Sequence, residues 1–213
     1  MTEGLTPEEA EAVTAEALRL NDRYVREVIE RFNVCPFARG ARISGRAIRE
    51  VLLFDACDEE KAADAIERHE RGPEAVEIVQ LILPRVKASP RAFEEFVSRV
   101  RAARALRPGA PPFALAGFHP EFGLNLKNAD TAVAFFRRAP DPMIQLVRLT
   151  TIDALTRDAL TPAEMVERFL RGEEPPPPPI NQRITRDNYA LLQREGTEVI
   201  AAIYAAIAGD RRR

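Results

Sequence analysis

Two rare residues could carry chemistry in this chain. His119 is one of only two histidines, and Cys35 is one of only two cysteines. His119 follows an apolar run, Phe113 to Gly117, that is typical of a buried strand. Because α/β proteins commonly place functional groups where a strand gives way to a loop, this position favours a functional histidine. A thiol and an imidazole that lie together can act as nucleophile and general base, so this pair is the candidate catalytic centre.

A Cys–His pair needs further groups that orient the imidazole and hold the substrate. Glu121 or Asp130 could orient the imidazole of His119 through a hydrogen bond. An arginine offers a planar fork of donors that suits a carboxylate or a phosphate, so we expect a small anionic substrate. The residues expected to bind it are Arg39, Arg138, Arg148 and Asn188, whereas Arg137 is expected to be an ordinary surface residue. The reaction would be group transfer or hydrolysis, with no cofactor.

The surroundings of Cys35 set how reactive its thiol can be. The apolar pattern of the first helix continues to Phe32, and the helix should end before Pro36, because the residue before a proline disfavours helical angles. Cys35 would then lie at a helix C-terminus, which raises a thiol pKa. The groups that could offset this effect are Arg39, Arg42 and His119.

Every one of these residues also has a structural interpretation. Cys35 could be a small buried thiol that fills a gap, and the ring of His119 could cap a loop carbonyl. The arginines could form ion pairs with Asp130, Asp141 or Glu121. The chain would then be an anion-binding or interaction module without catalysis. A metalloenzyme with Cys35, His119 and Glu121 as ligands is a second alternative, but no ligand pair has the close spacing of a zinc site, and we expect no metal.

The composition limits the classes of partner. The chain has 213 residues with a net charge of -2, so we expect no general attraction to nucleic acid or to an anionic membrane. No apolar run approaches the ~20 residues that span a bilayer, and the acidic N-terminal stretch has no secretory signal pattern. Two cysteines do not make a disulfide framework, so we expect a cytoplasmic protein with reduced thiols.

Strand and helix patterns alternate along the chain. Thr6 and Pro7 predict the start of the first helix, and Asp130 is expected to cap a short helix through Arg137. Apolar runs predict strands at 48–54, 76–83, 113–118 and 143–149. This order favours an α/β fold with a single four-stranded sheet, mixed or mostly parallel, that is covered by helices. An α+β two-layer sandwich is the alternative.

The chain divides into three predicted parts. Residues 1–170 form the α/β domain with its N-terminal helix, residues 171–183 form a proline-rich spacer, and residues 184–213 form a C-terminal helix. Because the last helix has too many apolar positions for a solvated helix, we expect it to pack on the domain. The spacer would also let it reach a second copy, so a monomer and a homodimer both remain open.

Several short motifs together resemble the bacterial family known as domain of unknown function 1415. The family pattern LNLCPFA is similar to residues 32–38, FHPDY to 118–122, and NRSPYP to 137–142, followed by a strand that ends in an arginine, here Arg148. The family ending ERNIATLRRLG is similar to residues 186–196, so the resemblance covers roughly 15–196. It implies a fold and a set of residues, but no reaction.

Three positions depart from that family pattern. Arg137 stands where the family has Asn, Ala139 where it has Ser, and Gln145 where a His is common. All three changes alter groups that could orient a substrate. The resemblance therefore implies a diverged member, with a different substrate or without the parent chemistry.

Overall fold

The computed structural model describes residues 4–109, 112–156, 162–173, 178 and 180–212. Within them lies a sheet of four strands in the order β1-β2-β4-β3. β1 is parallel to β2, and β4 is antiparallel to both of its neighbours. The strands are β1 (Ala47–Val51), β2 (Ile78–Ile82), β3 (Phe113–Phe118) and β4 (Met143–Arg148). The prediction of an α/β fold with a single mixed sheet is confirmed.

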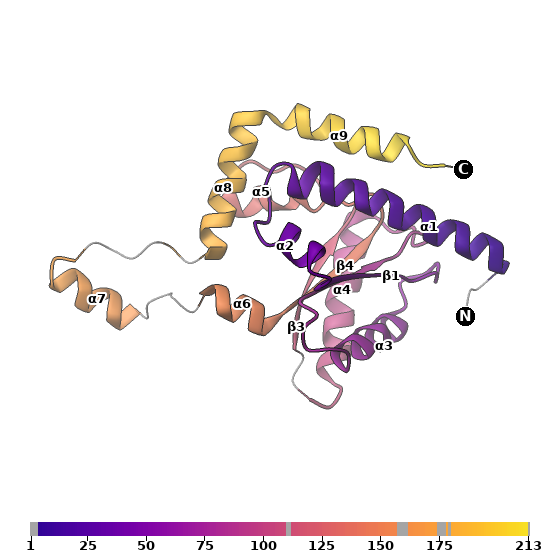
Figure 1. Cartoon of the computed structure of the whole chain (residues 1–213), viewed down its shortest axis with the longest axis horizontal. Helices are drawn as coiled ribbons and strands as arrows, with labels where there is room; N and C mark the ends of the chain where they lie inside the picture. Colours follow the sequence, from indigo (N-terminus) through magenta and orange to yellow (C-terminus); the bar gives the residue numbers. More distant parts are fainter. Residues whose placement is uncertain (1–3, 110–111, 157–161, 174–177, 179, 213) are drawn as a thin grey trace.

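Helices cover both faces of this sheet, so the two-layer sandwich is not the arrangement observed (Figure 1). One face, called the α1 face below, is covered by α1 (Pro7–Tyr24), α5 (Ala129–Phe136) and α9 (Thr197–Gly209). The other, called the α4 face, is covered by α3 (Glu59–Glu70) and α4 (Pro90–Ala105). The remaining helices are η1 (Val25–Glu30), α2 (Ala38–Ile43), α6 (Leu149–Thr156), α7 (Pro162–Leu170) and α8 (Ile180–Glu195).

Successive residues of each strand serve opposite faces of the sheet. On β3, Phe118 joins the core of the α1 face, whereas Phe113, five residues earlier, joins the core of the α4 face. On β4, Met143 lies in the first core and Ile144 in the second. This alternation decides which side of the sheet each candidate residue can serve.

The helix starts differ in how well the sequence predicts them. The Thr6 side chain accepts a hydrogen bond from the Glu9 N–H, and the Glu9 carboxylate accepts one from the Thr6 N–H, which confirms the start of α1. The expected cap of α5 was wrong, because Asn128 caps this helix and Asp130 lies in its first turn. The Asn128 side chain accepts from the Thr131 N–H, and Asn lies among the best N-cap residues.

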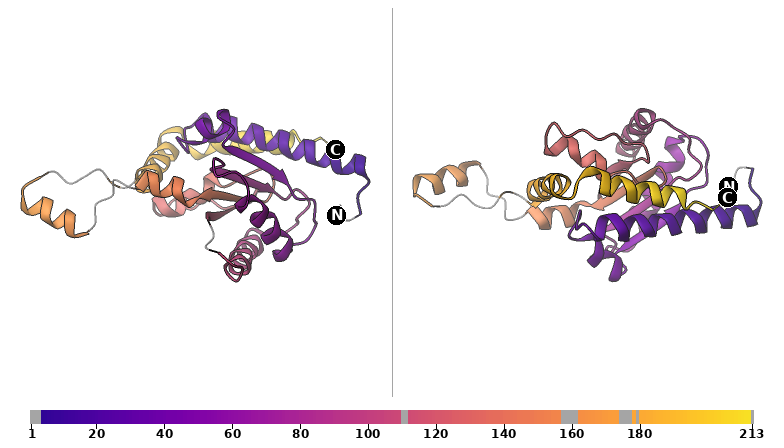
Figure 2. Two further views of the ribbon diagram at one scale, coloured as in Figure 1. Left: turned by 60° about the horizontal axis from the view of Figure 1, so that its bottom comes forward. Right: turned by 90° about the horizontal axis from the view of Figure 1, so that it is seen from above.

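The C-terminal segment forms two helices where the sequence predicts one. Gly196, with φ of 81°, separates α8 from α9, and glycine tolerates this left-handed conformation. α9 packs beside α1 (Figure 2), with Ile200 buried and the Tyr204 hydroxyl donating to the Phe135 carbonyl at 3.1 Å. α8 already begins at Ile180, inside the predicted spacer, and most of the proline run (175–177 and 179) lies outside the described residues.

α7 projects from the rest of the structure in every view (Figures 1 and 2). Its side chains Val166, Phe169 and Leu170 are exposed. Across the described part of the chain, no helix combines the length and the apolar character needed to cross a membrane.

Candidate functional site

His119 lies on the α4 face, where backbone groups and aromatic rings hold it. Its Nδ1 accepts from the Glu121 N–H at 3.1 Å, so the proton lies on Nε2, which donates to the Ala88 carbonyl at 2.9 Å. The ring packs against Phe93 and Phe122 at centroid distances of 5.8 Å, and the residue is only 3% exposed. Because both nitrogens are engaged, this imidazole caps a loop and has no free nitrogen for a substrate.

Two of the predicted anion-binding arginines are also engaged by the protein. The Arg148 Nε donates to the Val76 carbonyl at 2.7 Å, and its guanidinium lies over the Phe113 ring at 4.5 Å. Arg148 is buried, on the same face of the sheet as Phe113. The Arg138 Nε donates to the Pro120 carbonyl at 3.3 Å. Arg148 therefore ties β4 to the segment before β2, and Arg138 ties the loop after α5 to the loop after β3.

The other groups predicted to assist His119 lie at the surface. Glu121 is exposed and reaches His119 through its backbone N–H rather than through its carboxylate. Asp130 is exposed in the first turn of α5, and Arg39 is exposed on α2. Among the residues that the structure describes, none of these predicted groups places a carboxylate or guanidinium on the imidazole.

Cys35 and His119 are not brought together. Cys35 lines a cavity on the α1 face together with Phe118, whereas His119, the next residue along the chain, packs on the α4 face. Asn188, the predicted substrate-binding residue on α8, does line this cavity, and its Nδ2 donates to the Val34 carbonyl at 3.1 Å. The same separation removes the proposed metal site, and no group of three or more potential ligands gathers among the described residues.

The cavity at Cys35 lies between the sheet, η1 and the loop before α2. Its volume is about 170 Å³, well above the ~10–15 Å³ that one water needs. Its polar lining consists of Tyr24, Cys35, Arg42, Arg49, Gln80, Arg137, Gln145 and Asn188. Its apolar lining consists of Val25, Ile29, Val34, Ala38, Ala47, Ile78, Phe118, Val133 and Phe136.

A π-helical turn forms one wall of this cavity. α1 continues as η1, a π-helix of six residues in which Val25 and Ile29 line the cavity. The Val34 N–H then donates to the Ile29 carbonyl at 2.9 Å, which holds the loop that carries Cys35 against the end of η1. π-helical turns are rare and often occur at functional sites.

The thiol of Cys35 is protonated at neutral pH. Burial raises its pKa, an effect that hydrogen bonds from the N–H groups of Phe37 and Ala38 oppose. These donors belong to the start of α2, so Cys35 precedes a short helix as well as following a long one. The sequence did not predict α2, and the expected effect of a helix C-terminus is replaced by that of burial.

A polar row crosses the floor of the cavity. Arg49 on β1, Gln80 on β2 and Gln145 on β4 occupy paired positions in the strand register. The Gln80 Nε2 donates to the Gln145 Oε1 at 3.2 Å. The neighbouring positions Val51, Ile82 and Met143, one step along the same face, are all apolar and belong to the core. Polar side chains are unusual in the middle of a covered sheet face, because an apolar residue would pack there without unmet hydrogen bonds.

The three arginines of the cavity differ in how they are paired. Arg42 forms a two-pronged ion pair with Glu30, at 2.6 and 2.9 Å. Arg49 makes one long contact, 3.5 Å, with Asp22. The Arg137 guanidinium forms no hydrogen bond and no ion pair within the described residues.

Arg137 stays charged although its surroundings are partly apolar. Burial against the cavity walls lowers the pKa of its guanidinium, while the residue as a whole is exposed. Because this exposure keeps the guanidinium in contact with water, the arginine remains protonated. Among the described residues that line the cavity there is no aspartate or glutamate. Within this described lining, no acidic residue offsets the positive charge of Arg137.

The fold and the site describe a small α/β protein with a ligand-sized cavity between its sheet and the end of its first helix. A family model described as "Protein of unknown function (DUF1415)" matches residues 16–171, and the chain belongs to that family. The match ends before residues 186–196, so the resemblance of that stretch stays a prediction. The comparison with curated proteins found no match, and neither did the comparison with solved structures.

Proposed function

We propose that this protein binds a small organic anion in the cavity at Cys35. The observation that carries the proposal is Arg137, an unpaired cation in a cavity whose described lining has no acid. A guanidinium is satisfied by a carboxylate or a phosphate, which accepts two of its hydrogen bonds at once. The apolar walls favour a ligand with a hydrocarbon body, since small-molecule sites combine an apolar lining with a few placed polar groups.

Binding is favoured over the Cys–His enzyme that the sequence suggests. A cysteine nucleophile needs a base or a lowered pKa. The described lining of the cavity contains no histidine or carboxylate, and burial raises the pKa of the thiol. A cytoplasmic location and the absence of nucleic-acid partners remain part of the proposal. Both cysteines are free, as expected in a reducing compartment.

The test is calorimetric titration of the full chain with carboxylates and phosphate. We expect saturable binding of at least one organic anion, with a raised Tm. Affinity should fall about tenfold or more in Arg137→Gln, because a charge-assisted pair is lost. The control is Arg91→Gln, a change in an exposed arginine on α4. Absence of binding, or equal affinity in Arg137→Gln and Arg91→Gln, would overturn the proposal.

A further inference from the structure

We propose that the ligand is a short dicarboxylate that spans the sheet, with one carboxylate on Arg137 and the other on Arg49. This inference rests on the proposed function and adds the class of ligand. Its basis is the placement of two available cations at two sides of one cavity, with hydrogen-bonding groups between them.

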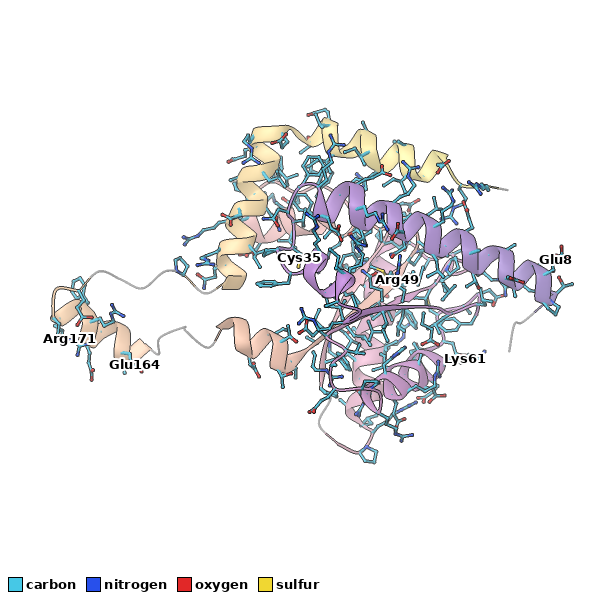
Figure 3. All side chains as sticks on the ribbon, viewed as in Figure 1. Glu8, Cys35, Arg49, Lys61, Glu164 and Arg171 are labelled. Carbon is cyan, nitrogen blue, oxygen red and sulfur yellow. The ribbon has the colours of Figure 1, made fainter. Side chains whose placement is uncertain are left out.

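The two arginines enter the cavity from opposite edges of the sheet. Arg49 is on β1, one edge strand, and the Arg137 carbonyl accepts from the His119 N–H at the end of β3, the other edge strand. Three strand spacings separate those edges, roughly 14 Å between backbones. Both side chains contribute to the lining of the same cavity, so the two cations border one hollow. Arg49 and Cys35 both lie on the side of the sheet that α1 covers (Figure 3).

Arg49 is available for a ligand because its acidic neighbour is shared. Asp22 accepts from the Arg26 Nε at 2.8 Å, whereas its contact with Arg49 is 3.5 Å. One carboxylate thus serves two cations and holds Arg26 more closely. Arg42 offers the opposite case, since Glu30 already engages it at two oxygens. The cavity therefore has two cations to offer.

The floor between the two cations can bind the middle of the ligand. After the Gln80–Gln145 hydrogen bond, the Gln145 amide keeps its N–H donors and the Gln80 carbonyl keeps its acceptor capacity. These groups suit a hydroxyl or carbonyl substituent on the chain between the carboxylates. The walls at Ile29 and Phe136 would contact its methylene groups.

The test compares glutarate with pentanoate, which has the same number of carbons but only one carboxylate. Affinities are measured by calorimetry for the wild type, Arg49→Gln, Arg137→Gln and the Arg91→Gln control. We expect glutarate to bind about tenfold or more tightly than pentanoate, corresponding to a second charge-assisted contact. Arg49→Gln should lower glutarate affinity to the level of pentanoate and leave pentanoate affinity unchanged. Arg137→Gln should weaken both ligands.

The outcomes separate this inference from the function on which it rests. If glutarate and pentanoate bind equally and only Arg137→Gln weakens them, the cavity binds anions but the dicarboxylate inference is wrong. The dicarboxylate inference is also wrong if Arg49→Gln leaves the ratio of the two affinities unchanged. If no anion binds the wild type, both proposals fail. Circular dichroism and Tm of each variant verify that a lost affinity does not reflect a lost fold.

Discussion

The loop at His119 and the cavity at Cys35 lie on opposite faces of one sheet, and they use their polar groups in opposite ways. At His119 both ring nitrogens bond to backbone groups, Nδ1 to the Glu121 N–H and Nε2 to the Ala88 carbonyl. In the cavity at Cys35, the guanidinium of Arg137 has no partner among the described residues. Gln80 and Gln145 share one hydrogen bond and keep further donors and acceptors unused. The comparison teaches that a rare residue type can be fully engaged by the protein itself, whereas unused hydrogen-bonding capacity marks where a ligand could be accommodated.

Replacing His119 with alanine is expected to have the largest effect. The change leaves the Ala88 carbonyl and the Glu121 N–H without partners and opens a gap between two aromatic rings. We expect the free energy of unfolding to fall by about 2–4 kcal/mol. Urea denaturation measures the loss, and anion affinity in the cavity should not change.

His69 provides the matched control. It is the other histidine, lies on α3 and bonds to Glu50 of β1, where it is partly exposed. His69→Ala should cost about 1 kcal/mol or less. An anion affinity that falls in His119→Ala alone would show that the two faces are coupled and would break the comparison.

A second test replaces the two glutamines of the polar row by apolar side chains of similar size and keeps Arg49. In a double variant, Gln80→Leu with Gln145→Leu, both partners of the hydrogen bond become apolar, which is expected to be nearly neutral for stability, within about 1 kcal/mol. Anion affinity should fall about tenfold, because the two positions no longer offer the amide donors and acceptors of the glutamines. Each single variant should be less stable than the double. Unchanged affinity in the double variant would assign the row a structural role.

Alkylation of the two thiols by iodoacetamide sharpens the comparison further. Burial raises the pKa of both Cys35 and Cys57. Thiolate is the reactive form, so both should react slowly at neutral pH and faster only above the ordinary thiol pKa of ~8.5. At pH 9, a bound anion should slow the alkylation of Cys35 several-fold and leave that of Cys57 unchanged. Equal protection of both thiols would show that the ligand acts elsewhere.

The smallest expected effect concerns Asp141, which lines a hollow on the His119 side. Burial raises the pKa of this carboxyl, although Arg211 opposes the shift at 2.7 Å. The unfolded chain then loses this proton at a lower pH than the folded chain. Its contribution to stability is therefore present below about pH 4 and is lost as pH rises through the folded pKa.

Asp141→Asn removes that titration. The unfolding free energy of the wild type, measured relative to that of the variant, should fall as pH rises from 4 to 7. Urea denaturation at several pH values measures it. If the wild type instead gains stability relative to the variant as pH rises, the ion pair with Arg211 outweighs burial.

The sequence predicts the elements of this fold better than their mutual placement. The run Phe113–Phe118 is a strand as predicted, because an apolar run is a local signal. The cap of α5 is also local, and Asn128 could have been recognised from its type alone. The glycine at 196 likewise signals a break between two helices.

The site depends on the register between strands and on which face of the sheet each residue serves. Neither property can be read from neighbouring residues in the sequence. Nothing near Gln145 in sequence indicates that it lies opposite Gln80, since pairing of β2 with β4 arises only on folding. Cys35 and His119 lie on opposite faces because His119 follows Phe118 by one position, and a shift of one residue changes the face. Arg137, expected at the surface, lines the cavity because α5 ends above it.

The six-residue π-helix at the end of α1 suggests how this family could change its ligands over time. The hydrogen bond of a π-helix closes over one more residue than that of an α-helix. A helix can therefore gain a residue at η1 while both of its ends keep their contacts. Such a gain moves the wall at Val25 and Ile29 in one step, which no single side-chain replacement does. Among relatives, the capacity of the hollow should therefore follow the number of residues between Tyr24 and Cys35. Insertions and deletions, rather than substitutions, would be the changes that record shifts of ligand size.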